Sequence, residues 1–152
     1  MVKKNEKKKQ IPTYLVMIGF MFYMFVLVLD ILFMTEFGFG KLHYKILGSV
    51  LFISGAIFSM NGRINLGRAY HFMPRAKKLV ITGLYRWFKN PIYIGNQISL
   101  LGLAVVLGSI PGLIATIIIL VPVHIIRAKF EERVLVTTFG REYLEYKKRT
   151  LF

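Results

Sequence analysis

The sequence contains no cysteine, which excludes disulfides, thiolate nucleophiles and cysteine-ligated metal sites. Acidic residues are scarce, with seven Asp and Glu against 21 Lys and Arg. The three histidines, His43, His71 and His124, lack the spacing of a zinc site, so no bound metal is expected. Any chemistry must therefore use few carboxylates and many cations.

Apolar residues dominate what is present. They make up 55% of the 152 residues, and the net charge is +14. This content is too apolar for a soluble domain of such length, and the length fits one domain, residues 1–152. The charge alone would suggest nucleic acid, but the basic residues gather in three blocks between apolar runs. We therefore expect the protein to contact membrane lipids and not nucleic acid. We expect no obligate protein partner.

Four apolar stretches reach or approach the roughly 20 residues that a helix needs to cross a bilayer. They cover residues 11–34, 44–60, 92–107 and 110–126. The first is too long for a signal peptide and no cleavage site follows it, so we interpret it as a retained span. The second carries spaced Gly and Ser residues, which favour close helix packing in lipid. An uncharged linker, Gly108 to Gly112, predicts a tight hairpin between spans three and four. The fold class expected is all-α and integral to the membrane.

Charge predicts the orientation of these spans. The basic blocks lie at the start of the chain, in the loop Gly62–Asn90, and from Arg127 onward, and they contain every Lys and Arg except Lys41 and Lys45. With four spans, all three blocks lie on one side of the membrane. The positive-inside rule then makes both termini and the long loop cytoplasmic. We expect a multi-pass protein of a prokaryotic cell membrane whose loop folds against the membrane face and the tail.

Two segments stand out from this apolar background. Thr82 to Gly95 is polar, aromatic and rich in turn residues, and Phe130-Glu131-Glu132 follows span four. Together with the tail from Phe139, they resemble the membrane methyltransferase family that contains isoprenylcysteine carboxyl methyltransferase and phosphatidylethanolamine N-methyltransferase. The resemblance implies S-adenosylmethionine as methyl donor, S-adenosylhomocysteine as product, and a lipophilic acceptor carrying an isoprenylcysteine-like carboxyl group. It also implies a cofactor region over residues 62–95 and 127–152, with amphipathic tail helices beside the site.

The resemblance carries specific residues with it. Those implied to bind the cofactor are Tyr85, Lys89, Asn90, Pro91, Tyr93, Gly95, Glu131 and Glu132. The family pattern has arginine and histidine before the proline, whereas this chain has Lys89 and Asn90. Methyl transfer to a carboxylate or an amine needs mainly alignment and charge stabilisation, so an asparagine can replace the imidazole. The alternative for Pro91 is that it merely begins span three.

Arg127 and Glu132 are the expected catalytic residues. Arg127 could orient the carboxylate of a substrate, and the glutamate pair could hold the cationic donor. The alternative is charge balance, including a pair between Arg127 and Glu131 at i,i+4 spacing. His124 shares the helix face of Arg127, and we expect it to pack against a neighbouring helix.

Other functions stay open at this point. A phospholipid amine N-methyltransferase would use the same donor. A sterol-type reductase with a nicotinamide cofactor would share the C-terminal motifs but is usually much longer. A non-enzymatic scaffold whose basic face binds anionic lipid would leave the two glutamates without a purpose.

Overall fold

A computed structural model describes residues 2–33, 42–67 and 79–151. The helices, in chain order, are α1 Val2–Phe33, α2 Leu42–Leu66, α3 Pro91–Val106, α4 Ile110–Ala115, α5 Val121–Phe139 and α6 Arg141–Arg149. Part of the expected cytoplasmic loop, residues 68–78, lies outside the described residues, as does Lys41. The described part of the chain contains no sheet, and a lone bridge pairs Phe88 with Leu151.

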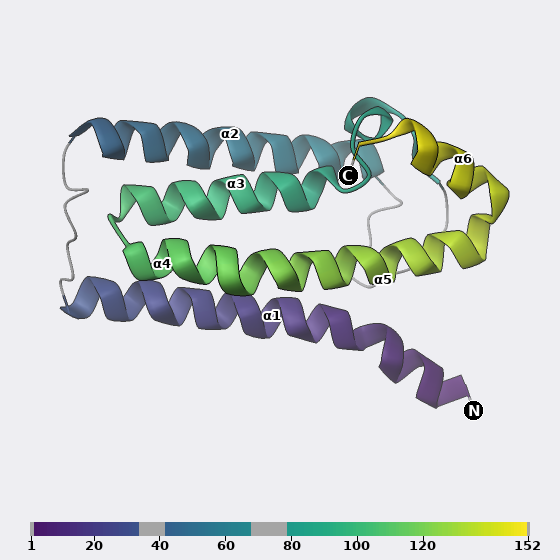
Figure 1. Cartoon of the computed structure of the whole chain (residues 1–152), viewed down its shortest axis with the longest axis horizontal. Coiled ribbons are helices and arrows are strands. Elements are labelled where there is room, and N and C mark those ends of the chain that lie inside the picture. Colours follow the sequence, from purple (N-terminus) through teal and green to yellow (C-terminus); the bar gives the residue numbers. More distant parts are fainter. Residues whose placement is uncertain (1, 34–41, 68–78, 152) are drawn as a thin grey trace.

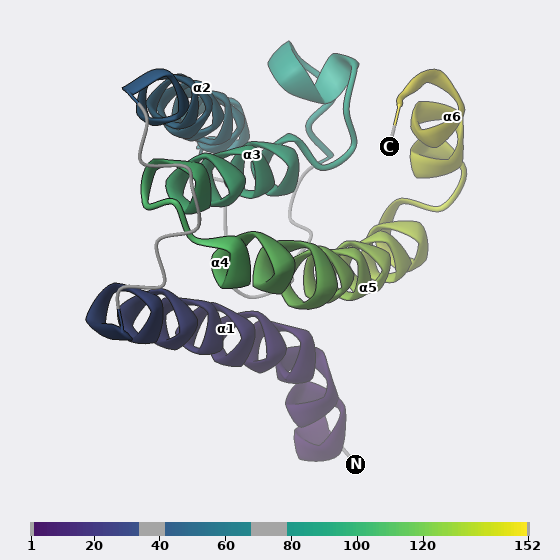
Figure 2. The same ribbon diagram turned by 60° about the vertical axis from the view of Figure 1, so that its left-hand side comes forward.

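The long helices stack side by side in the order α2, α3, α4–α5 and α1 (Figures 1 and 2). Both chain ends lie toward the same end of this stack, together with α6 and the segment that precedes α3 (Figure 1). Four alternating passes therefore bring the three basic blocks of the sequence to one end, as far as the described residues show.

Three helical stretches within the described residues are long and apolar enough to cross a membrane. They are Ile11–Phe33, Leu42–Leu66 and Ile110–Phe139. The apolar helix α3 has 16 residues and reaches only about 24 Å at 1.5 Å per residue, against a hydrocarbon core of about 30 Å. The predicted all-α membrane fold is confirmed.

Helices α2 and α3 pack antiparallel at backbone distance. A Cβ atom added to Gly55 would lie 2.5 Å from Ser99 N, and one added to Gly95 would lie 2.5 Å from Ser59 N. At Gly102 the same atom would lie 2.4 Å from Phe52 N. Small residues drive helix association in lipid because they let backbones approach. The prediction that the second span is a packing helix is confirmed.

The turn between α3 and α4 explains the hairpin. Gly108 has a φ of 67° and donates its N–H to Val105 O at 3.1 Å, while Ser109 N donates to Ala104 O at 2.9 Å. This pair of bonds is a Schellman motif, which ends a helix with a glycine in the left-handed region. The Ser109 side chain then accepts from Gly112 N at 2.9 Å and caps α4. Few residues are needed to reverse the chain.

The last long helix differs from the predicted span four. It continues past residue 126 to Phe139 and ends at Gly140, which has a φ of 53°. Between α4 and α5 lies a π-helical segment, Thr116–Leu120, in which Val121 N donates to Thr116 O. Pro122 comes two residues after this segment and has no N–H to donate in the regular hydrogen-bond pattern of an α-helix. A wider turn is therefore accommodated here.

The described core centres on a tyrosine of α1. Tyr23 is fully buried with Leu27, Ala115 and Leu120, and its hydroxyl donates to Leu100 O at 2.7 Å. The other aromatic side chains of this part of α1 are exposed, as lipid-facing residues are: Phe20, Phe22 and Phe25. Through this bond Tyr23 links α1 to α3, which lie on opposite sides of the α4–α5 layer.

Candidate active site

Tyr93, Arg127 and Glu131 meet where the start of α3 faces the middle of α5. The Tyr93 hydroxyl donates to Glu131 Oε1 at 2.6 Å, and Arg127 Nε donates to the same oxygen at 3.1 Å. The guanidinium carbon of Arg127 lies 5.8 Å from the centre of the Tyr93 ring. Pro91 begins α3 and fixes its start, and the i,i+4 spacing on α5 aligns the ion pair.

Burial differs within this cluster. The Arg127 side chain is 8% exposed, whereas that of Glu131 is 27% exposed. A buried guanidinium needs a carboxylate partner, and Glu131 supplies it. The predicted charge pair is therefore confirmed. The carboxylate of Glu131 is thus less enclosed than the guanidinium of Arg127.

Glu132 points to a different partner. Its Oε1 contacts Lys147 Nζ of α6, and both side chains are partly exposed. Adjacent residues on a helix are separated by about 100°, and here the two glutamates have different partners. Each has a cation beside it, Arg127 for Glu131 and Lys147 for Glu132. Two consecutive carboxylates of α5 thus have different cationic partners. Their role in cofactor binding stays a prediction.

The remaining residues of the first motif surround the start of α3. Asn90 is the N-cap residue, and its carbonyl accepts from Tyr93 N and Ile94 N. Lys89 donates its backbone N–H to Leu151 O at 3.3 Å. Tyr85 is buried in the 3₁₀ turn Gly83–Arg86. These residues lie next to the cluster in the chain, and their expected contacts with a cofactor stay predictions.

Gly95 occupies a different face from Tyr93. It is buried against Ser59 and Gly55 of α2, with no room for a side chain. Its absence of a Cβ atom is explained by this close approach of two backbones. The structure does not bring Gly95 to the Tyr93 cluster.

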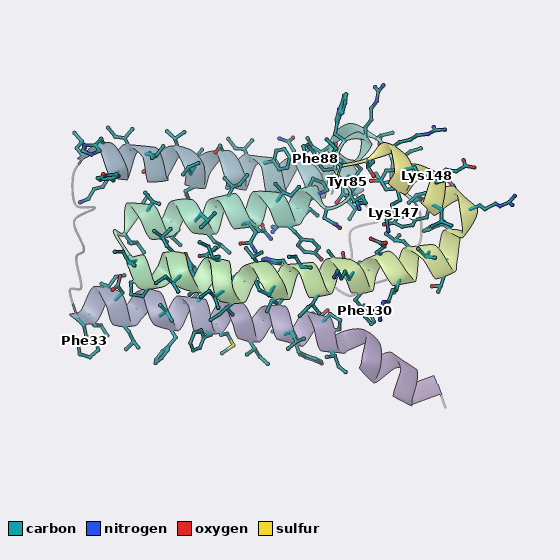
Figure 3. All side chains as sticks on the ribbon, viewed as in Figure 1. Phe33, Tyr85, Phe88, Phe130, Lys147 and Lys148 are labelled. Carbon is teal, nitrogen blue, oxygen red and sulfur yellow. The ribbon has the colours of Figure 1, made fainter. Side chains whose placement is uncertain are left out.

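The tail docks onto the segment before α3, a contact that sequence reasoning stated only in general terms. Leu151 N donates to Trp87 O at 2.8 Å, and the Tyr146 hydroxyl donates to Tyr85 O at 2.8 Å. Figure 3 shows Tyr85, Phe88 and Lys147 gathered where this segment meets α6. Burial raises the pKa of Tyr146 to about 12. Burial and the negative charge of Glu132 raise the pKa of Tyr143 as well. No spacing in the sequence indicates these pairings.

A second polar layer lies next to the cluster, and the sequence analysis did not connect its members. The His124 ring stacks on Tyr93 with centres 5.2 Å apart, and Gln97 Nε2 lies 2.6 Å from His124 Nδ1. Tyr93 and Gln97 are four residues apart, and His124 and Arg127 are three apart, so helical spacing was the available signal. The expectation that His124 packs against a neighbouring helix is confirmed.

Comparison with known proteins adds independent findings. The chain matches the phospholipid methyltransferase family over residues 43–142. Over 109 residues it is 29% identical to a protein-S-isoprenylcysteine O-methyltransferase of Saccharomyces cerevisiae, covering 68% of this chain and 46% of the relative. It is 30% identical over 107 residues to protein-S-isoprenylcysteine O-methyltransferase B of Arabidopsis thaliana, covering 67% and 54%. The Xenopus laevis protein-S-isoprenylcysteine O-methyltransferase is 27% identical over 110 residues, covering 69% and 38%. The chain thus spans about half the length of these relatives, or less.

Proposed function

Because the chain belongs to the phospholipid methyltransferase family, we propose that it transfers a methyl group from S-adenosylmethionine to a carboxylate on a lipophilic acceptor. The similar proteins are named as isoprenylcysteine O-methyltransferases. Their names favour an acceptor in which a carboxyl group is attached to an isoprenylated cysteine or a compound like it.

The observation that carries this proposal is the cluster of Tyr93, Arg127 and Glu131. It joins a cation, a carboxylate and a phenol in a chain whose helices are otherwise largely apolar. Ionisable groups within membrane helices usually mark a functional site. A buried guanidinium suits an acceptor carboxylate, and partly exposed carboxylates suit a cationic donor.

The residues present fit such a donor. S-adenosylmethionine, when bound, supplies a methyl group on a positively charged sulfur. Glu131 and Glu132 place two carboxylates next to one another in the chain, and both are partly exposed. In the described structure each already contacts a cation, so a charged donor would share these carboxylates or replace Lys147 at Glu132. Tyr85, Lys89, Asn90, Pro91 and Gly95 remain predicted contributors around this region.

The reaction itself asks little proton chemistry of the protein. Methyl transfer to a carboxylate would form an ester C–O bond at the methyl carbon, and the electron pair of the C–S bond that breaks would stay on sulfur. No proton moves, so no general base is required at the position of Asn90. Arg127 would hold and orient the acceptor carboxylate while Tyr93 fixes Glu131, so that alignment supplies most of the rate enhancement.

We also propose the orientation that charge predicts. The basic blocks at the two termini and around α3 would face the cytoplasm. The donor would then enter from water, and the acceptor from the cytoplasmic half of the bilayer. Reporter fusions at each terminus test this directly, since both are expected to report the cytoplasmic side. Reporters on opposite sides would contradict the proposed orientation.

Binding and turnover of radiolabelled S-adenosylmethionine by the purified protein in lipid nanodiscs test the function. We expect methyl transfer to an isoprenylated cysteine derivative with a free carboxyl group. Glu131→Gln, Glu132→Gln and Tyr93→Phe should weaken donor binding or turnover, whereas Glu142→Gln, at an exposed glutamate of α6, should not. Donor binding that is equal in all four variants and the wild type would contradict the site assignment.

The phospholipid methyltransferase family description favours a second acceptor, a phospholipid amine. An amine must lose its proton to become a nucleophile, whereas a carboxylate is already ionised at neutral pH. Offering phosphatidylethanolamine and the isoprenylated cysteine derivative in parallel separates these acceptors. Methylation of the lipid alone would favour the amine.

A further inference from the structure

Three side chains, Gln97, His124 and Tyr93, contact one another in a row between α3 and α5, which we call the line. The His124 ring stacks on the Tyr93 ring, with centres 5.2 Å apart and planes 29° apart. Gln97 Nε2 lies 2.6 Å from His124 Nδ1. Tyr93 and Gln97 are four residues apart on α3, so both reach the same His124 on α5. The other end of the line is the bond from Tyr93 to Glu131.

Burying the polar side chains of Gln97 and His124 at this place is energetically unfavourable. His124 is 7% exposed, and the helices around it are apolar enough for a membrane. Gln97 Oε1 is buried without a hydrogen-bond partner in the described part of the chain. Burial of an unpaired amide oxygen is unfavourable, and apolar side chains at both positions would avoid it. Packing alone therefore does not explain why an amide and an imidazole meet here.

The contact has a specific effect on the imidazole. The hydrogen bond restrains the imidazole on its Nδ1 side, and which of the two groups donates depends on the tautomer of the ring. It also fixes the rotation of the ring, because Gln97 approaches Nδ1 from α3. A ring fixed in this way presents one constant face to Tyr93.

We propose that Gln97 and His124 are positioning residues for Tyr93. Gln97 orients the imidazole, the imidazole restricts the Tyr93 ring from one side, and Tyr93 in turn aims its hydroxyl at Glu131. The inference rests on the proposed function, because it makes this line a support for the methyl-transfer site. Neither residue needs to touch the donor or the acceptor.

The neighbouring residue Asn96 provides a matched control. It also carries a half-buried amide on α3, but it accepts a bond from Ser59 Oγ of α2 at 2.7 Å, on the other side of the helix. Replacing Asn96 by leucine removes one interhelical hydrogen bond in the same part of α3 without touching the line to Tyr93. Loss of stability alone should therefore be similar in Asn96→Leu and Gln97→Leu.

The experiment compares Gln97→Leu, His124→Phe, the double variant and Asn96→Leu in nanodiscs. We expect kcat for methyl transfer to fall about tenfold or more in each single variant of the line, because small misplacements near a reacting centre are costly. The KM for S-adenosylmethionine should change little. The double variant should lose no more than the singles, since both remove one link of the same line. Asn96→Leu should keep its kcat.

A second measurement does not depend on turnover. The protein has eight tyrosines, and ring-labelled tyrosine gives an NMR signal for Tyr93 that is identified by its loss in Tyr93→Phe. We expect this signal to shift in Gln97→Leu and in His124→Phe, but not in Asn96→Leu. An unshifted Tyr93 signal would overturn the inference. So would additive losses of kcat, or an equal loss in Asn96→Leu.

The two measurements also separate the inference from the proposed function. A wild type that neither binds S-adenosylmethionine nor transfers a methyl group would contradict the function, while the Tyr93 signal would still decide the positioning. An active wild type with unaffected Gln97→Leu and His124→Phe variants would contradict the positioning alone.

Discussion

Helix α3 packs against α2 on one side and against α5 on the other, and the two contacts use different chemistry. Toward α2 it presents Gly95, Ser99 and Gly102, and the two backbones touch. Toward α5 it presents Tyr93 and Gln97, which reach across to polar side chains. In lipid, the first contact gains mainly from close packing and the second from hydrogen bonds between side chains. We infer that the α2 contact provides rigidity and that the α5 contact provides the site.

Removing the positive charge of Arg127, on the α5 side, should have the largest effect, and it should lower turnover. We expect Arg127→Met to lower kcat by about 10²–10³, a range typical of losing one preorganised charge-stabilising donor. The variant should also be less stable, because Glu131 loses its buried partner. Arg133→Met, at an exposed position on the same helix, is the control. Equal turnover in both variants, measured with the isoprenylated cysteine derivative, would remove Arg127 from the site.

The next largest effect is expected from adding a methyl group to the face of α3 that packs against α2. This change should lower the stability of the protein. Gly102→Ala would set a Cβ 2.4 Å from Phe52 N, and such overpacking costs about 1–3 kcal/mol. At Gly19 of α1 the added atom would lie 3.5 Å from its nearest neighbour, an ordinary contact. The melting temperature in detergent should therefore fall in Gly102→Ala and stay near wild type in Gly19→Ala. Equal melting temperatures would mean that α2 and α3 are not in backbone contact.

A smaller loss of stability is expected from removing a hydrogen bond between side chains on the α2 side. Ser59→Ala removes the bond to Asn96 Oδ1, and hydrogen bonds between membrane helices average about 0.6 kcal/mol. The hydroxyl of Ser54 is exposed and bonds to Leu51 O within its own helix, so Ser54→Ala is the matched control. Unfolding in a detergent titration measures both, and a Ser59→Ala loss as large as that of Gly102→Ala would contradict the difference drawn between packing and hydrogen bonding.

The smallest effect at neutral pH is expected at Tyr146, in the tail that contacts the segment before α3. The pKa of Tyr146 is raised from its ordinary 10.0 to about 12 by burial. A raised pKa of an acidic group means that the folded protein holds its proton more tightly. The contribution is complete below pH 10 and is lost between pH 10 and 12. Melting temperature across this range should decline less steeply in Tyr146→Phe than in the wild type, and parallel curves would count against the buried hydroxyl.

Much of the fold was predictable from the sequence because membrane burial imposes length and composition on each helix. Apolar runs, spaced glycines in α2 and the breaker at Gly108 follow from local rules, and so does the end of α5 at Gly140. The start of α6 and the continuation of α5 beyond residue 126 were less clear, because paired charges such as Arg127 and Glu131 let a helix continue where isolated charges would end a span.

The candidate site was predictable only in part. Helical spacing indicated the pair of Arg127 and Glu131, and it put His124 on the same face. The bonds from Tyr93 to Glu131 and from Tyr146 to Tyr85 join residues 38 and 61 positions apart. Such contacts depend on how helices pack, and no periodicity along the chain encodes them. The roles assigned to Lys89, Asn90 and Gly95 rest on resemblance and remain predictions.

The π-helical segment before Pro122 has a consequence for the whole layer. The buried positions Gly112, Thr116, Leu120, His124 and Arg127 follow one another along a single stripe. A regular helix turns about 100° per residue, so four-residue steps drift around it, whereas the π-helical turn fits more residues into one turn and offsets this drift. The segment Thr116–Leu120 therefore keeps His124 on the same side of the helix as Thr116, where its ring meets Tyr93 of α3. The angular phase between the two halves of this helix depends on that one wide turn.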